Sequence, residues 1–369
     1  MLEYIFITFV VIFCIQVFYY IFIFGFFSFT NRTETKKVFT QPVSVLICAK
    51  NEAKNLKQNL PFYLYQEYSN YELVLINDCS YDTTLEVLKQ FKKTSTIPVK
   101  IVNVAVNEQF WGNKKYALTL GIKAASHEHL LFTDADCKPS SNSWISEMVS
   151  NFSTSNQVIL GYGSYKKIKN SFLNKLIRFE TLLTAIQYFS YAKIGIPYMG
   201  VGRNLSYTKS LFFSVNGFAN HLKIKSGDDD LFINQVATSK NTTYCYSRNS
   251  FTISSPKPSF KTWIKQKRRH ISTAHYYKPL HKFLLGLFYS SQLLFWVVGL
   301  LLLVMLFKWK LVLIMVIARF IIQYFSIGFS AQKLNENDLI VFIPFFELFL
   351  IFTQMFIFIK NLVSKPTHW

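Results

Sequence analysis

Two aspartates directly after an apolar run have the spacing most suggestive of chemistry. Asp134 and Asp136 follow residues 130–132 and precede a Lys-Pro-Ser sequence. The run suits a buried strand, so the acids would lie at its carboxyl end, where open α/β sheets bind ligands. In an extended segment, residues two apart point the same way. The pair is predicted to hold Mg²⁺ or Mn²⁺ beside the oxygens of a phosphorylated substrate. The alternative is an ordinary strand end with turn-forming Asp.

Two earlier apolar runs end on polar residues in the same way. One ends at Lys50-Asn51-Glu52, where Asn51 is expected to cap a helix, and the next ends at Asn77-Asp78. Strands that alternate with helices predict an α/β fold with a mostly parallel sheet and right-handed crossovers, which is a nucleotide-binding architecture. The predicted strands cover residues 43–49, 71–76 and 99–104, and the predicted helices run from 51 to about 66 and from about 82 to 91.

Apolar residues gather in four long runs. A hydrophobic content of 51% with 38 Phe is high for a purely soluble chain. Each run approaches the ~20 residues that a bilayer-spanning helix needs. The runs lie at about 3–29, 283–307, 311–330 and 339–359. We expect a transmembrane anchor at 1–30, an α/β domain at 31–258, an amphipathic helix at 259–282, and a membrane region of about three helices at 283–369.

Positive charges flank these runs unevenly. The first run is too long for a secretory signal and lacks a positive start and a small-residue cleavage site, so it should stay as an anchor. The positive-inside rule places residues 31–282 in the cytoplasm of an integral protein of the bacterial cytoplasmic membrane. Arg319 lies within the third run, so a shallow hairpin over 283–330 is the alternative. The flanking charges are Arg32, Lys36, Lys37, Lys278, His281 and Lys282, while Lys308 and Lys310 would face outward.

The net charge of +20 indicates an anionic partner. Nucleic acid is rejected as the main partner because no nucleic-acid motif is present. A basic face beside spanning helices more often meets membrane lipid headgroups or nucleotide phosphates. The five cysteines show no C-x-x-C spacing, so neither a zinc site nor a disulfide framework is expected.

Three consecutive acids form a second candidate site. Asp228, Asp229 and Asp230 precede an apolar helix, where helix-dipole and N-cap chemistry also favour acids for structural reasons. Upstream, a helix is predicted at 170–193, and Gly202-Arg203 follows it in a glycine-rich segment that suits close approach of the backbone to a ligand. A plain glycine turn into a strand is the alternative.

A basic amphipathic helix follows the α/β domain. Phe260, Ile264, Ile271 and Ala274 form an apolar stripe, while the polar Gln266 and Arg269 fall on the other side. This pattern is typical of a helix in the membrane interface. A surface helix that only binds anionic lipid would look similar.

Four segments in order resemble motifs of membrane-bound family-two glycosyltransferases, which have the GT-A fold. The Ala-Lys-Asn-Glu turn at 49–52 and the Asn-Asp-Cys-Ser turn at 77–80 resemble nucleotide-binding loops, which implies Glu52 and Asp78 as nucleotide contacts. Residues 112–118 resemble the Gly-Lys-x-x-Ala-Leu segment, which implies Lys114 near the nucleotide. The pair Asp134 and Asp136 falls where the family has its metal-binding D-x-D. First-turn, turn and solvated roles remain the alternatives for Glu52, Asp78 and Lys114.

The later segments resemble acceptor and catalytic motifs of the same family. Residues 226–230 resemble the Gly-Asp-Asp segment of hyaluronan and chitin synthases and the Thr-Glu-Asp of cellulose synthases. This resemblance implies that Asp229 is the base and that Asp228 or Asp230 caps the helix, with both of these acids beside the substrate. Asp230 stands at a position where the family often has Arg. The strand with Gly202 and Arg203 would line the acceptor site.

Residues 266–270 resemble the family's Q-x-x-R-W. This resemblance implies that Arg269 contacts the diphosphate and Gln266 the acceptor or product, with His270 near substrate in place of Trp. The loss of Trp removes the usual platform on which a processive synthase stacks its growing sugar chain.

The resemblance covers residues 43–275 and implies a metal-dependent inverting transfer. The donor would be a nucleotide-sugar such as a UDP-sugar, transferring a hexosyl or N-acetylhexosaminyl group. The small number of predicted membrane spans, and His270 in place of Trp, favour transfer to a lipid-linked acceptor or a single transfer to a saccharide. They disfavour a processive synthase that extrudes its polymer. A homo-oligomer would remove the shortage of spans. A transporter or scaffold with a degenerate nucleotide domain is the alternative from another class, and the intact acids argue against it.

Overall fold

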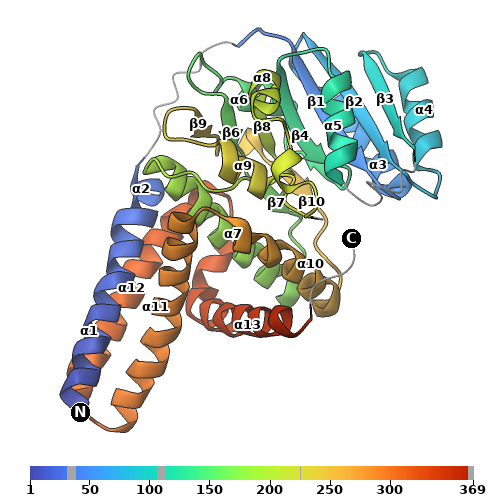
Figure 1. Ribbon diagram of the computed structural model, residues 1–369. Coiled ribbons are helices and arrows are strands. Elements are labelled where there is room, and N and C mark those ends of the chain that lie inside the picture. The colour runs from blue at the N-terminus through green and yellow to red at the C-terminus, as the bar shows by residue number, and fades with distance from the viewer. Residues whose placement is uncertain (31–38, 106–113, 225, 365–369) are drawn as a thin grey trace.

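The computed structural model describes residues 1–30, 39–105, 114–224 and 226–364, with an α/β domain standing on long helices (Figure 1). The domain is built on a seven-stranded sheet of order β3-β2-β1-β4-β8-β6-β9. The first four of these strands are parallel, β8 is antiparallel to both neighbours, and β6 and β9 are parallel. The strands are β1 (Val43–Ala49), β2 (Tyr71–Asp78), β3 (Val99–Val104), β4 (His129–Asp134), β6 (Val158–Leu160), β8 (Leu205–Thr208) and β9 (Thr242–Tyr244).

Helices cover both faces of the parallel part of this sheet. Alternate residues such as Leu46 and Ile76 share one core with α5 (Lys114–Ala124). Their neighbours, such as Ile47 and Leu75, share a separate core with α3 (Ala53–Asn59) and α4 (Thr84–Thr94). Burial on both faces explains why β1 and β2 read as continuous apolar runs in the sequence.

The predicted α/β fold and its first three strands are confirmed. The strand predicted at 71–76 continues to Asp78, and α3 stops at Asn59 before a 3₁₀ turn over Leu60–Tyr63. The prediction that Asn51 caps α3 is wrong: Glu52 stands at the N-cap, and Asn51 has φ +56°. The Asn51 side chain instead accepts the backbone N–H of Tyr81 at 2.8 Å.

A smaller sheet and several helices complete the domain. The second sheet has the order β5-β10-β7, formed by β5 (Cys137–Pro139), β10 (Thr252–Ser254) and β7 (Gly163–Tyr165). The helices are α6 (Trp144–Val149), α7 (Phe172–Lys193), α8 (Lys209–Ser214), α9 (Asp230–Val236) and α10 (Phe260–Thr273). The sequence predicted α7 and α10 closely.

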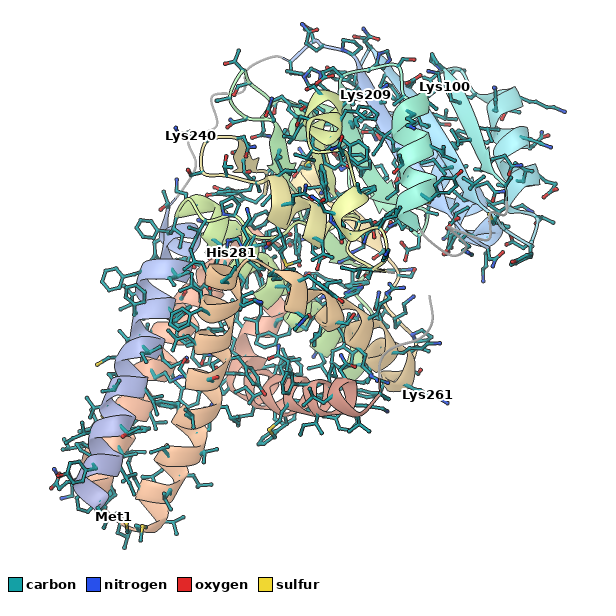
Figure 2. The ribbon with its side chains drawn as sticks, in the orientation of Figure 1. Met1, Lys100, Lys209, Lys240, Lys261 and His281 are labelled. Atoms are coloured by element: carbon teal, nitrogen blue, oxygen red, sulfur yellow. The ribbon has the colours of Figure 1, made fainter. Side chains whose placement is uncertain are left out.

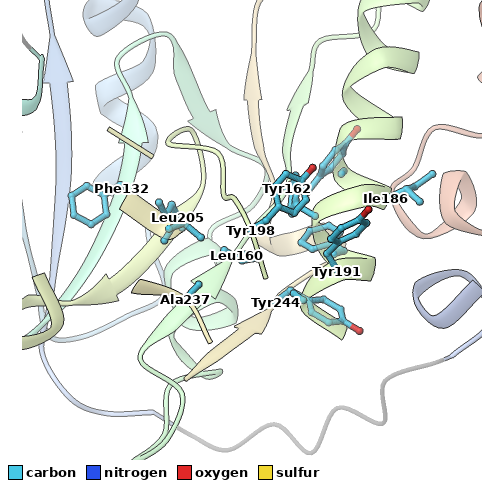
Figure 3. Close-up of a cluster of buried hydrophobic side chains, with 14 of the residues drawn as sticks. Phe132, Leu160, Tyr162, Ile186, Tyr191, Tyr198, Leu205, Ala237 and Tyr244 are labelled. Atoms are coloured by element: carbon cyan, nitrogen blue, oxygen red, sulfur yellow. The ribbon is translucent and has the colours of Figure 1, made fainter. Parts of the chain in front are cut away.

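A buried aromatic cluster joins α7 to the far end of the main sheet. Figure 3 shows Tyr191 of α7 near Tyr244 of β9, with Leu160 of β6 in the same cluster. From the same helix, the Tyr188 hydroxyl donates to the Gly161 carbonyl at 2.8 Å. This packing fixes α7, which also packs against the N-terminal apolar helix.

Three of the long apolar helices lie side by side (Figure 1). They are a continuous N-terminal helix, α1 (Leu2–Phe18) through a π turn (Tyr19–Ile23) to α2 (Phe24–Phe29), with α11 (Pro279–Val304) and α12 (Trp309–Lys333). Glu3 and Lys308 form an ion pair of 2.8 Å at the end farthest from the sheet. Both helices of the 283–330 region therefore run along the N-terminal helix, and each is long and apolar enough to cross a membrane.

The fourth apolar helix, α13 (Ile343–Val363), lies across the other three (Figure 1). Length and composition qualify the span Asn337–Val363, like the other three predicted runs, as long and apolar enough to cross a membrane. Both of its ends are nevertheless tied to the α/β side. Arg178 of α7 pairs with Glu336 just before it, and Arg268 Nε of α10 donates to Asn361 Oδ1 at 2.8 Å.

Several basic side chains lie on the α/β domain and on α10. Figure 2 shows Lys100, Lys209, Lys240 and Lys261 there, while Met1 lies at the opposite end. This distribution suits a domain that meets phosphate groups beside a membrane.

A buried ion pair connects the apolar helices to one another. Arg319 of α12 pairs with Glu347 of α13, and both side chains are almost fully buried. Arg319 Nη2 also donates to Gln16 Oε1 of α1 at 2.9 Å, and Gln292 Nε2 of α11 donates to Glu347 Oε1 at 2.9 Å. Polar groups buried among apolar helices are costly unless paired, so this network specifies how the four helices pack.

Replacing Arg319 should destabilise the helix packing. Arg319→Leu leaves Glu347 buried without its cation, at a cost of about 3–5 kcal/mol. We expect a lower melting temperature in detergent, and partial recovery in the double variant Arg319→Leu/Glu347→Leu. Lys310→Leu, at an exposed position on the same helix, is the control and should change little. A double variant as unstable as Arg319→Leu would contradict the pairing.

Candidate active site

Side chains from the loops after β1 and β2 connect the two loops. The backbone N–H of Asn51 donates to Ser80 Oγ at 3.0 Å, and that of Glu52 donates to Thr84 Oγ1 at 2.9 Å. Burial raises the pKa of Glu52, although Asn55 donates to its carboxylate. Asp78 Oδ2 lies 4.0 Å from Lys50 Nζ. Burial raises the pKa of Asp78, although the nearby lysine acts to lower it.

Lys114 joins the two acidic segments that lie far apart in the sequence. Its ammonium lies 3.0 Å from Asp134 Oδ1 and 2.9 Å from Asp228 Oδ2. Burial lowers the pKa of Lys114, but the two carboxylates outweigh burial and hold its pKa well above the ordinary value. The lysine starts α5, while Gly112 and Asn113 of the same sequence motif lie outside the described residues.

The two D-x-D acids lie on either side of a strand end. Asp134 is the last residue of β4, and Asp136 lies in the turn to β5, so the extended segment expected for both is wrong. Burial, with Asp134 nearby, raises the pKa of Asp136. Within the described residues, no three Asp, Glu, His or Cys side chains gather as a metal cluster. Two carboxylate ligands with open positions fit Mg²⁺ or Mn²⁺, which takes its remaining ligands from substrate phosphates and water.

Each acid of the Asp228–Asp230 cluster has its own partner. Asp228 binds Lys114, while Asp229 Oδ2 accepts the backbone N–H of Gly202 at 2.7 Å. Asp229, rather than Asp228 or Asp230, is the N-cap of α9, so the predicted choice of cap is wrong. Burial, then the neighbouring carboxylates Asp228 and Asp230, raise the pKa of Asp229 to about 7. A carboxylate with this pKa can take a proton near neutral pH.

Asp230 faces the interior of the protein. Its Oδ2 accepts the hydroxyls of Thr273 and, at 2.7 Å, Tyr277. Its side chain is buried, and burial raises its pKa. These bonds attach α9 to Thr273 at the end of α10 and to Tyr277 just beyond that helix.

Gly202 and Arg203 differ in how they serve the site. A Cβ on Gly202 would lie 3.3 Å from Asp229 Oδ2, so the small residue leaves room for this carboxylate. Arg203 donates to Ser254 Oγ at 2.7 Å and to the Gly163 carbonyl at 2.8 Å. Its guanidinium also stacks 4.3 Å from the Tyr165 ring. Arg203 thereby braces the small sheet.

The basic helix α10 carries the remaining predicted residues. Gln266 Oε1 is buried with no hydrogen-bond partner among the described residues, which leaves it available to a ligand. Arg269 lines a large cavity beside α10, while His270 is exposed. Lys267 pairs with Glu180 of α7, so α10 is held against the helix that leaves the sheet.

Lys115 also supports the site, although no feature of the sequence distinguishes its role from that of Lys114. Its buried ammonium donates to the carbonyls of His221, Ile224 and Ser226 at 2.8, 2.9 and 2.7 Å. Burial lowers its pKa to about 8. These three bonds hold the segment that leads into Asp228, so adjacent lysines fix the acidic cluster from two sides.

The parallel-dominated sheet with acids at its carboxyl edge is the arrangement in which open α/β sheets bind ligands. Two family profiles match the sequence: Glycosyl transferase family 2 over residues 44–213 and Glycosyl transferase family group 2 over residues 149–322. The chain belongs to the family-two glycosyltransferases, as its motif order implied.

Characterised relatives match over part of their length. A poly-beta-1,6-N-acetyl-D-glucosamine synthase of Staphylococcus epidermidis is 37% identical over 94 residues, covering 26% of this chain and 21% of that protein. A 4,4'-diaponeurosporenoate glycosyltransferase of Staphylococcus haemolyticus is 33% identical over 111 residues, covering 30% and 27%.

A solved structure has a similar fold. It is the mannosyltransferase PcManGT from Pyrobaculum calidifontis in complex with GDP-Man and Mn²⁺, with a TM-score of 0.59 at 15% identity. The match covers 90% of this chain and 99% of that one, so the likeness of fold extends beyond the α/β domain into the apolar helices.

Removing the Lys115 ammonium should impair transfer by loosening the loop before Asp228. We expect Lys115→Met to lower sugar transfer roughly tenfold or more, because each hydrogen bond from a charged group contributes about 1.5–3 kcal/mol. Hydrogen exchange should rise in residues 221–227. Lys123→Met, on the exposed side of the same helix, is the matched control. Normal transfer with unchanged exchange in Lys115→Met would contradict this role.

Proposed function

We propose that this protein is a metal-dependent inverting glycosyltransferase. It moves a hexosyl or N-acetylhexosaminyl group from a nucleotide-sugar, such as a UDP-sugar, to a lipid-linked or saccharide acceptor at the membrane. The observation that carries the proposal is the position of Asp229: a carboxylate with a pKa of about 7 lies beside Asp228, which Lys114 joins to the D-x-D acid Asp134.

The donor diphosphate would lie at the carboxyl edge of β1, β2 and β4. Asp134 and Asp136 would hold Mg²⁺ or Mn²⁺, which supplies positive charge to the departing diphosphate when bound. Glu52 and Asp78 stand on the connected loops that would hold the nucleoside. Lys114 and Arg269 add fixed positive charge, which stabilises the leaving group most where water is excluded.

Asp229 would take the proton of the acceptor hydroxyl. Its Oδ2 accepts the backbone N–H of Gly202 at 2.7 Å and its Oδ1 accepts the backbone N–H of Asp230 at 2.8 Å, so the carboxylate cannot rotate freely. Gln266, with its unpartnered buried oxygen, would bind the acceptor or the product. A single displacement by the acceptor oxygen inverts the anomeric centre and requires no second carboxylate nucleophile.

A processive synthase is the second candidate. The similarity to a poly-beta-1,6-N-acetyl-D-glucosamine synthase favours it, but that alignment covers 21% of the relative.

The catalytic domain would lie in the bacterial cytoplasm at 31–258, followed by the interfacial helix at 259–282 and the membrane region at 283–369.

Asp229→Asn should nearly abolish transfer and preserve the fold. Asn caps a helix about as well as Asp but accepts no proton, so transfer should fall roughly 10²–10⁴-fold with donor binding little changed. Asp228→Asn and Asp230→Asn, assayed in parallel, should be less damaging. In the wild type, kcat/KM should rise with pH through a midpoint near the Asp229 pKa of about 7, because the base must be deprotonated. Near-normal transfer by Asp229→Asn would disprove its role as base.

Removal of the metal should stop transfer. Excess EDTA is expected to abolish sugar transfer by the wild type, and added Mn²⁺ or Mg²⁺ to restore it, because the diphosphate otherwise leaves without the charge it needs. Asp136→Asn should show the same loss and no rescue at ordinary metal concentrations. Ser140→Ala, at an exposed position just after β5, is the control for local substitution. Full activity in EDTA would rule out metal dependence.

A further inference from the structure

A large cavity lies between the catalytic domain and the apolar helices. It has a volume of about 1000 Å³ and is bounded by α7, α10, α11, α12 and α13. This is at the upper end for small-molecule sites, which hold roughly 300–1000 Å³. Its apolar wall is formed by Leu183, Ile186, Leu285, Phe288, Ile327, Leu350 and Ile351. The cavity is therefore large and apolar enough for a long hydrocarbon chain.

One side of this cavity is lined by residues that lie next to the acidic cluster in the sequence or bind it, although none of the three acids lines the cavity itself. Ser226 and Arg269 line it there, and Lys115 holds the Ser226 carbonyl at 2.7 Å. Tyr277 also lines it and donates to Asp230 Oδ2 at 2.7 Å. A head group bound beside Ser226 would lie next to the segment that carries the proposed base, Asp229.

Exposed apolar side chains also line the cavity. Tyr276, Phe358 and Leu362 are 57, 59 and 72% exposed. These residues stand between α10 and α13, the two helices that Arg268 ties together. Exposed large apolar groups beside membrane helices mark contact with lipid rather than water. An occupant that enters past them comes from the bilayer.

The polar side chains deep in the cavity are already paired. Glu347 binds Arg319, accepts from Gln292 Nε2 at 2.9 Å and accepts from the Tyr20 hydroxyl at 3.1 Å. Gln323 Nε2 in turn donates to the Tyr20 hydroxyl at 3.2 Å. A sugar chain along this wall would have to compete with these bonds for partners, whereas a hydrocarbon chain would leave them intact.

We propose that the acceptor is a membrane-dissolved amphiphile with a hydroxyl-bearing head group, and that its apolar chain occupies this cavity. The inference rests on the proposed glycosyltransferase function. The head hydroxyl oxygen forms a bond to the anomeric carbon, its proton passes to Asp229, and the sugar–phosphate bond breaks. The nucleoside diphosphate leaves with that electron pair. The chain anchors the acceptor while only its head reaches the site.

Gly286 allows the cavity to be blocked without overpacking. It lines the cavity on α11, and a Cβ built there meets no atom within 4 Å. Gly286→Phe therefore fills open space and also replaces a weak helix former. Val297→Phe is the matched control, since Val297 lies on the same helix, is 55% exposed and does not line the cavity.

The probe is an alkyl glucoside with a long chain and a photoreactive diazirine near the chain end. The full-length protein is placed in phosphatidylethanolamine–phosphatidylglycerol nanodiscs and irradiated. We expect labelled peptides from α11 and α13 that line the cavity. Labelling should fall roughly tenfold in Gly286→Phe, because losing the burial of about two methylene groups of the probe chain weakens binding by that factor. Labelling should remain unchanged in Val297→Phe. Unlabelled glucosides should compete better as their chains lengthen.

Three results would overturn the inference. They are equal labelling in Gly286→Phe, labelling confined to helix faces outside the cavity, and competition by free glucose as effective as that by the long-chain glucoside. The last result would instead favour a saccharide acceptor. Nucleotide-sugar binding is measured on the same samples. Its absence in the wild type would contradict the proposed function itself, whereas intact donor binding with unchanged labelling would contradict the acceptor site alone.

Discussion

The salt bridges of Lys114 are the interaction on which the candidate site depends. The partly buried ammonium of Lys114 lies between Asp134 at the end of β4 and Asp228 before α9. Without this cation, two partly buried carboxylates would face each other without compensation, and such uncompensated charges are strongly destabilising. The lysine thus sets the spacing between the candidate metal acids and the candidate base Asp229. Lys115 adds three backbone bonds from the same helix start, so one turn of α5 positions both halves of the site.

The site is coupled to the membrane helices through a small number of polar contacts. Asp230 binds the end of α10 through Thr273 and Tyr277, and Arg178 binds the segment before α13. These contacts cross from the sheet domain to the basic helix α10 and to the segment before the apolar helix α13. Because hydrogen bonds and ion pairs are directional, they fix the angle at which α10 and α13 meet the domain. The large cavity is the space that this arrangement leaves open.

Local sequence patterns predicted the elements well and the side-chain roles less well. Continuous apolar runs gave the parallel strands because both faces of the sheet are covered, and the basic amphipathic pattern gave α10. Asn51 was expected to cap a helix, yet it adopts a left-handed conformation and binds the next loop. Arg203 and Asp230 are predicted beside substrate, and the structure adds hydrogen bonds by which Arg203 braces the small sheet and Asp230 binds Tyr277 just after α10. In each case the partner lies far away in the sequence.

The sequence by itself determined the α/β architecture, the four long apolar helices and the order of the family-two motifs. These depend on local hydrophobic periodicity and on residue types at short spacing, which are written directly in the chain. The tertiary structure alone decided which carboxylate of three faces Gly202, that Lys114 joins two motifs, and that α13 lies across the other helices. Those features depend on pairings between distant segments, whose energies appear only once the sheet has brought the segments together.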